Sequence, residues 1–265
     1  MWTPRPPRRR KHFGMTGGQI AILAGMGTLN CAVLGLAAAL LLGRSAPTSV
    51  ASNLATQPRS PTATITPTPT LEPGWVLIEK PEEGFAIALP PTWVEVDMRA
   101  PTMKDAIDAI RTQHPDLTST VLNYLETLDI NELHAQGIIF VAFDRELPGG
   151  LASNFGVNVN LARWSDGQDI AMDEVVEIYL ETLASHNITA PRHSRVSLQV
   201  GEAEKFQYQR IESYPDGQML NVNAVQYIFI RGQDVYVLTL GYTEEQAEVY
   251  ASIAEKIAQG LRRLE

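Results

Sequence analysis

The feature that most constrains this chain is an apolar run near its N-terminus, residues 20–43. Between Ile20 and Gly43 the only clearly polar side chains are Thr28 and Asn30. A helix of this length rises about 36 Å, at about 1.5 Å per residue, which is enough to cross the ~30 Å hydrocarbon core of a bilayer. The run therefore predicts one transmembrane anchor, and it makes membrane lipid the first expected partner.

The charges that flank this run predict its orientation. Residues 1–19 contain no acid and five bases, which are Arg5, Arg8, Arg9, Arg10 and Lys11. Only Arg44 follows the run closely. Because the cytoplasmic flank of a membrane helix carries the excess of Lys and Arg, residues 1–19 should form a short basic cytoplasmic segment. The expected location is the cell membrane, with a single pass and the C-terminal part outside the cytoplasm.

A cleaved signal peptide is the competing interpretation of the same run. The apolar region of a signal peptide usually has about 7–15 residues and ends at a small-x-small cleavage site. Here the run is longer, and the sequence Gly43-Arg44-Ser45-Ala46 fits such a site poorly. The sequence therefore favours an uncleaved anchor over a mature chain that begins near Ala46.

Small residues recur every four positions within the run, at Gly27, Cys31, Gly35, Ala39 and Gly43. They share one helix face, where a second helix could approach closely, so weak self-association through the anchor is one interpretation. The other is that Gly and Ala are simply frequent in membrane helices, and we favour it. Lipid attachment at Cys31 is less favoured still, because this cysteine lies in the middle of the run.

The segment that follows, residues 44–74, is rich in Ser, Thr, Ala and Pro and ends in TATITPTPTLEPG. Such a composition cannot bury a hydrophobic core, and its prolines favour extended, polyproline-like backbone. We interpret the segment as a linker that holds a folded domain away from the membrane.

Charge and cysteine content limit what the remaining domain, residues 75–265, can be. All thirty acids and fourteen of the 21 bases follow residue 71, which gives that part a net charge of −16. A surface this acidic repels nucleic acid, so we expect no nucleic-acid partner. Cys31 is the only cysteine, so the domain has no disulfide and no thiolate metal cluster.

Hydrophobic periodicity predicts the order of elements in this domain: two strands, two helices, two strands, a helix, four strands and a final helix. Residues 224–230 and 235–240 are apolar on both faces, so their strands should lie inside a sheet that helices cover on each side. Several connections are too short for a helical crossover, which requires antiparallel pairs. The expected fold class is α+β, a three-layer α/β/α sandwich around one mainly antiparallel central sheet.

The helical patterns also predict which residues are buried. Thr102 and Asp105 could cap a helix that presents Met103, Ile107 and Ile110 to the core. The clearest helix, residues 169–187, should bury a stripe of Met172, Val175, Val176, Tyr179, Leu180 and Leu183. Asp169, Asp173, Glu177 and Glu181 should then face solvent. The last helix should begin at Thr243, with Gln246 completing a capping box, and bury Tyr250, Ile253, Ile257, Leu261 and Leu264.

The stretch GFAIALPPTWVEV, residues 84–96, joins a strand to two prolines and a large aromatic. Phe85, Ile87 and Leu89 alternate with Ala86 and Ala88, whose small side chains would let a helix pack closely. The prolines should end the strand ladder, because proline has no N–H to donate. Trp93 should then lie buried as a hydrophobic plug at the sheet end.

This opening, EEGFAIALPPTW with Trp75 before it, resembles the first strands of PsbP-like proteins, the fold of an extrinsic photosystem II subunit. The expected order of elements is similar as well, over residues 75–263. The resemblance implies a PsbP-like domain in an exported, membrane-anchored protein of bacterial type. It also implies a binding or assembly factor without catalytic activity.

No residue pattern indicates catalysis or metal binding. His114, His134, His186 and His193 lack the i, i+4 spacing of a zinc site, and no phosphate-binding loop or nucleophile motif is present. His186 and His193 flank a loop and could meet, but solvent-facing histidines are the favoured interpretation. Asp169, Asp173, Glu177 and Glu181 are typical of a solvated helix face, with a weak cation site as the lesser alternative. We therefore predict no catalytic, cofactor or metal residue.

Two function classes follow from these patterns. The favoured one is a membrane-anchored extracytoplasmic module that binds an unidentified protein or small molecule and is not an enzyme. The alternative is an extracytoplasmic hydrolase whose site forms only in three dimensions; a histidine hydrogen-bonded to a carboxylate in a pocket would favour it. The expected contact surfaces are the loops at residues 144–154 and 186–193, since loops on a rigid scaffold often carry recognition.

Overall fold

The computed structural model describes residues 72–117, 122, 125–126, 128–146, 157–165, 167, 169–188, 191–213 and 219–264. The predicted cytoplasmic segment, the anchor at residues 20–43 and nearly all of the linker lie outside these residues. So do most of residues 116–128, DLTSTVLNYLETL, whose hydrophobic period predicts the second of the two consecutive helices, and residues 147–154 of the predicted contact loop. No helix within the described residues is both long enough and apolar enough to span a membrane.

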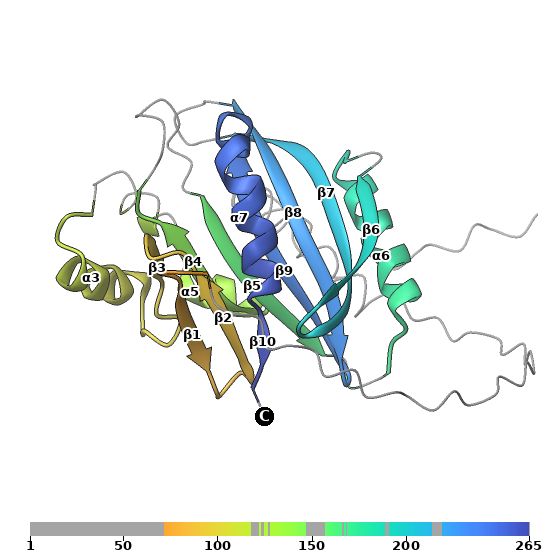
Figure 1. The fold of residues 1–265 in the computed structure, drawn as a ribbon, viewed down its shortest axis with the longest axis horizontal. Helices are drawn as coiled ribbons and strands as arrows, with labels where there is room; N and C mark the ends of the chain where they lie inside the picture. The colour runs from red at the N-terminus through yellow and green to blue at the C-terminus, as the bar shows by residue number, and fades with distance from the viewer. Residues whose placement is uncertain are drawn as a thin grey trace, which may run out of the picture.

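The centre of the domain is a seven-stranded sheet in which every neighbouring pair is antiparallel (Figure 1). Its spatial order is β3 (Trp93–Glu95), β4 (Ile138–Asp144), β5 (Asn158–Ser165), β9 (Asp234–Thr243), β8 (Met219–Arg231), β7 (Gly201–Ser213) and β6 (Arg192–Leu198). The α+β class and the antiparallel sheet are confirmed. The two strands that are apolar on both faces, β8 and β9, lie inside the sheet as predicted.

The expectation of a single sheet is wrong. The first two strands, β1 (Val76–Lys80) and β2 (Phe85–Leu89), form a separate three-stranded sheet with the short β10 (Arg262–Arg263). The reason lies in Pro90 and Pro91, which end the β2 ladder. The N–H of Trp93 donates to the carbonyl of Pro90 at 3.0 Å, which closes a β-turn with proline at its second position. The chain leaves this turn as β3 of the large sheet.

Among the described residues, three helices cover one face of the large sheet. They are α3 (Met103–Gln113), α5 (Ile130–Ala135) and α6 (Met172–Ser185), and their apolar residues form one hydrophobic cluster with residues of the sheet. Thr102 caps α3 by accepting the N–H of Asp105 at 3.2 Å, as predicted. Helix α5 is absent from the predicted order, because six residues are too few to show a helical period.

The predicted stripe of α6 is correct at its centre and wrong at one position. Val175, Tyr179 and Leu183 are fully buried, whereas Leu180 is 36% exposed and Thr182 is buried in its place. The hydroxyl of Thr182 donates to the carbonyl of Ile178 at 2.9 Å, so this polar group is satisfied within the helix. The buried face of α6 is therefore turned slightly away from the stripe that residue hydrophobicity predicted.

Helix α7 (Ala247–Gln259) and the small sheet cover the other face (Figure 1). The Gln246 half of the predicted capping box is present, since its Oε1 accepts the N–H of Thr243 at 2.9 Å in a short 3-10 turn that leads into α7. Tyr250, Ile257 and Leu261 are buried as predicted, while Ile253 and Leu264 are half-buried. The prediction that helices alone cover this face is therefore wrong, because the small sheet covers it together with α7.

The close helix contact predicted at Ala86 and Ala88 is present at Ala88, whereas Ala86 lies opposite Arg262 of β10. Gly260 follows α7, and a Cβ placed on it would lie 2.7 Å from the Cβ of Ala88. The N–H of Ala88 donates to the carbonyl of Gly260 at 3.3 Å. Small residues on both sides therefore allow the end of α7 to touch β2.

Buried tyrosines predict that the domain loses stability at alkaline pH. Burial raises the pKa of Tyr179, Tyr227, Tyr242 and Tyr250, and the bond from the Tyr250 hydroxyl to Asp144, at 2.6 Å, raises the last further. A tyrosine whose pKa is higher in the folded than in the unfolded state stabilises the fold. This stabilisation is complete at pH values below the unfolded-state pKa of about 10, and it is lost as the pH rises above that value. We expect the urea midpoint to fall between about pH 9 and 11, and to fall less steeply in Tyr250→Phe. A midpoint that stays constant over this range would contradict the assignment.

Candidate functional site

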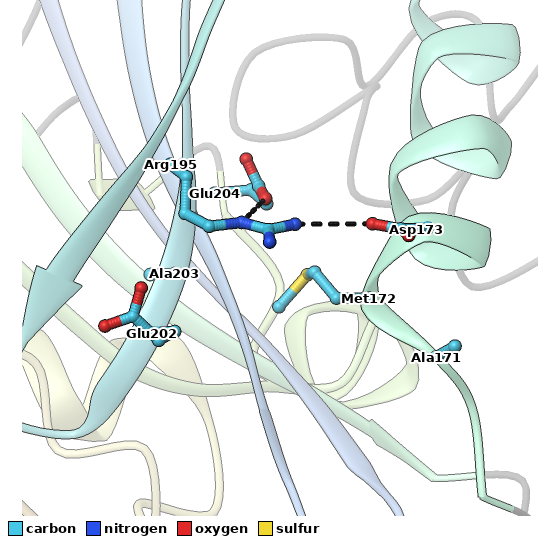
Figure 2. Close-up of a pocket in the computed structure, with 7 residues that line it drawn as sticks. All are labelled: Ala171, Met172, Asp173, Arg195, Glu202, Ala203 and Glu204. Atoms are coloured by element: carbon cyan, nitrogen blue, oxygen red, sulfur yellow. Dashed lines mark hydrogen bonds and ion pairs between the residues drawn. The ribbon is translucent and has the colours of Figure 1, made fainter. Parts of the chain in front are cut away.

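A pocket of about 230 Å³ lies between the N-terminus of α6 and the hairpin of β6 and β7 (Figure 2). Its lining residues come from these three elements and include one base and three acids. They are Ala171, Met172, Asp173, Arg195, Glu202, Ala203 and Glu204. The pocket is open to solvent at the surface, so a ligand could enter it without movement of the fold.

The hairpin sets which side chains reach this pocket. A tight turn after Leu198 returns the chain at Gly201, and the resulting register places Arg195 opposite Glu204 and His193 opposite Phe206. Residues directly opposite one another share a face of the sheet. This face is the one that α6 covers, because Phe206 belongs to the same hydrophobic cluster as Val175 and Tyr179 of α6.

Glu204 is the centre of the site. It is a carboxylate that is only 2% exposed, and each of its oxygens accepts a hydrogen bond. His193 Nε2 lies 2.6 Å from Oε2, and Arg195 Nε donates to Oε1 at 2.7 Å. A buried charge is tolerated only where donors or an opposite charge compensate it. His193 and Arg195 supply this compensation.

Arg195 joins Glu204 to helix α6. Its Nη2 donates to Oδ1 of Asp173 at 3.3 Å, and Figure 2 shows the guanidinium lying between the two carboxylates. The pKa of Arg195 is raised, first by the hydrogen bond to Glu204 and then by the charge of that carboxylate, against a smaller lowering by desolvation. Asp173 is 92% exposed, so its contact with Arg195 contributes little to stability.

His193 lies beside the pocket and is not among its lining residues. Its ring stacks on Phe206, with centroids 4.5 Å apart and planes 8° apart, and Phe206 in turn contacts Tyr179 at 4.8 Å. Nucleophilic catalysis would need a hydroxyl, thiol or water at the remaining ring nitrogen. Within the described part of the chain, this ring forms a hydrogen bond with Glu204 and stacks on Phe206, and no hydroxyl or thiol is hydrogen-bonded to its other nitrogen.

The other histidines do not converge on this site. His114 Nδ1 lies 3.4 Å from Arg145, His134 is exposed at the end of α5, and His186 Nδ1 lies 2.9 Å from the carbonyl of Thr182. The interpretation of His193 as a loop residue is wrong, since it belongs to strand β6 and contacts a buried carboxylate. The described residues hold no group of three or more His, Cys, Asp or Glu that could bind a metal ion.

The acidic side chains of the α6 region, Asp169, Asp173, Glu177 and Glu181, are all exposed, as predicted. The sequence reasoning missed that Asp173 contacts Arg195, and that Glu204 is buried. One signal could have found that Arg195 and Glu204 are neighbours, although not that Glu204 is buried. A two-residue turn at Gln199 and Val200, before the Gly201, places Arg195 directly opposite Glu204.

No protein-family model matches this chain, and no curated protein does. Similar solved structures include cyanobacterial PsbP from Synechocystis, with 9% identity, a TM-score of 0.42, and coverage of 77% of this chain and 99% of that one. LpqN of Mycobacterium tuberculosis, described as involved in cell envelope biogenesis, has 12% identity, a TM-score of 0.40, and coverage of 72% and 91%. The Ran-binding protein Mog1p of Saccharomyces cerevisiae has 9% identity, a TM-score of 0.39, and coverage of 72% and 96%.

Proposed function

We propose that this protein is a single-pass membrane protein whose extracytoplasmic domain binds a partner without catalysing a reaction. The apolar run at residues 20–43 and the five bases before it support the anchor and its orientation. The linker at residues 44–74 would let the domain reach a partner at some distance from the membrane. The partner is a protein or a small molecule.

The observation that carries the binding role is the environment of Glu204. His193 Nε2 lies 2.6 Å from one of its oxygens and Arg195 Nε donates to the other at 2.7 Å, so the carboxylate holds both neighbouring side chains in place. The arrangement fixes the guanidinium of Arg195 at the pocket wall, where 59% of that side chain is exposed. A fixed, exposed cation is suited to recognition of an anionic group.

The resemblance of residues 75–263 to PsbP-like proteins supports the same role. The motif at residues 82–93 and the order of elements both carry it, and the family consists largely of binding and assembly factors. We propose an assembly role of this kind outside the membrane.

The hydrolase remains the second candidate, because one observation favours it. His193 and Glu204 form a hydrogen-bonded histidine–carboxylate pair at 2.6 Å beside a pocket. Such a pair can orient a histidine as a general base. A reaction would then require a substrate or water molecule at the outer ring nitrogen of His193.

The predicted topology can be tested with protease. When protease is added to intact cells or spheroplasts, it should digest the domain that follows Gly74 and leave a membrane-embedded fragment with the N-terminus. In disrupted cells the protease also reaches the cytoplasmic side, so the membrane-embedded fragment should in addition lose residues from its N-terminus. A domain protected in intact cells, or a mature chain that begins near Ala46, would rule out the uncleaved anchor.

The binding role can be tested by cross-linking in whole cells. The full chain and a version that ends at Gly74 should be purified from the same detergent extract after cross-linking. A partner retained by the full chain and absent from the shortened chain supports the proposal. If the two chains retain the same proteins, the extracytoplasmic domain contributes no stable partner and the proposal is wrong.

A further inference from the structure

Strand β6 is an edge strand of the large sheet. Its seven residues, Arg192–Leu198, pair with β7 on one side, and no described residue forms a backbone hydrogen bond with β6 on the other side (Figure 1). In an antiparallel ladder about every second residue of an edge strand turns its N–H and C=O groups outward. The edge therefore offers a row of backbone donors and acceptors that an additional strand could use.

The side chains of β6 differ in charge from the rest of the domain. The strand reads RHSRVSL, with two arginines, one histidine and no acid, whereas residues 72–265 carry a net charge of −16. The first four residues of the strand are exposed. The strand's own side chains are thus basic, although Glu204 and Asp173 lie beside Arg195, and Arg192 in particular favours an acidic partner over a basic one.

The two arginines lie on opposite faces of the edge. Arg195 points to the α6 face, where Glu204 fixes its Nε and leaves Nη2 in the weaker contact with the exposed Asp173. A carboxylate from an added strand could replace Asp173 at little cost, because an exposed ion pair is worth little. Arg192 points to the opposite face, and no described carboxylate pairs with it. Both guanidinium groups are therefore accessible to acidic side chains.

We propose that β6 binds an extended acidic segment of a partner protein as an eighth strand of the sheet, a proposal that rests on the binding role given above. In such a strand the residues opposite Arg192 and Arg195 are three positions apart and fall on opposite faces. The recognised pattern is therefore two acidic residues separated by two others. A second copy of this chain fits less well, since symmetric antiparallel pairing of two β6 strands would place Arg195 opposite its own copy.

The test uses the full chain in detergent and a fluorescent peptide of sequence TVETVETV, which carries the predicted acid spacing. Binding should slow amide hydrogen exchange in residues 192–198. The charge reversal Arg192→Glu should weaken binding about tenfold or more, because an attractive cross-strand pair becomes a repulsive one. Arg99→Glu, at an exposed arginine outside the edge, is the matched control and should bind as the wild type does. A TVKTVKTV peptide, or the acidic peptide with alternate backbone nitrogens methylated, should not bind.

The proposal is overturned if Arg192→Glu binds the acidic peptide as tightly as the wild type, or if the methylated peptide binds equally. It is also overturned if the free protein forms a dimer that Arg192→Glu dissociates, since the edge would then bind a second copy. Cross-linking of Arg192→Glu in cells separates this proposal from the binding role. If Arg192→Glu retains the partner in full, the domain still binds a partner, but the β6 edge is not the binding site.

Discussion

Replacing Trp93 by alanine should lower the free energy of unfolding by about 3–5 kcal/mol, the usual range for deletion of a large buried aromatic side chain. Trp93 is only 7% exposed and belongs to the cluster that α7 and the small sheet cover. It is also the first residue of β3, where its backbone pairs with Asp144. The indole therefore fills the junction between the two sheets. Urea denaturation of the wild type and the variant measures the difference.

Trp93→Phe is the matched control for this prediction. It keeps an aromatic ring and removes the indole N–H, which is buried and has no hydrogen-bond partner among the described residues. Loss of an unsatisfied donor offsets part of the cavity cost, so we expect less than half of the alanine effect. A loss below about 1 kcal/mol for Trp93→Ala would mean that the ring is exposed in solution, and a binding role for it would follow.

The second large effect is expected at His193. His193→Phe keeps a ring that can stack on Phe206 but removes the donor to the buried carboxylate of Glu204. Hydrogen bonds to charged groups contribute about 1.5–3 kcal/mol, and the loss leaves one carboxylate oxygen buried without a partner. We expect a destabilisation of about 2 kcal/mol, measured by urea denaturation at pH 7.

Two further variants make this result specific. His134→Phe, at an exposed histidine of α5, should change the stability by no more than about 0.5 kcal/mol. In the background of Glu204→Gln, the His193→Phe change should cost clearly less than in the wild type, because no buried charge is left unpaired. Equal costs of His193→Phe in both backgrounds would show that Glu204 and His193 do not stabilise each other.

The sequence predicts those elements whose local pattern and tertiary environment agree. Helix α6, helix α7 with its Gln246 cap, and the interior strands β8 and β9 combine long hydrophobic periods with clear turn residues, and each is found close to its expected bounds. In the interior of the sheet the same apolar residues that favour a strand are the ones that pack. Local preference and burial therefore favour the same secondary structure.

The elements that the sequence did not predict share one physical cause, which is stabilisation by residues distant in the sequence. The sequence predicts a strand at residues 195–200, RVSLQV, but β6 begins at Arg192, because pairing with β7 holds residues that show no apolar alternation. The third strand of the small sheet is β10, whose two residues pair with β2 from the other end of the chain. Neither feature leaves a periodic signal in the sequence.

The candidate site was hidden for the same reason. Glu204 lies in a strand with polar residues on both sides, and its burial depends on α6, about 30 residues earlier, and on the donors of β6. A sequence pattern can identify a charged residue in a strand. It cannot show that two donors from the neighbouring strand allow this residue to be buried.

The central claim, that the extracytoplasmic domain acts by binding and not by turnover, is tested most directly by an activity assay. The purified full chain should be incubated with broad esterase, phosphatase, peptidase and glycosidase substrates, beside His193→Phe and Glu204→Gln variants whose fold is verified by circular dichroism. We predict that none of the three proteins gives turnover above the detergent background. A turnover that persists through purification and disappears in the folded His193→Phe variant would contradict the claim and assign the His193–Glu204 pair to a hydrolase.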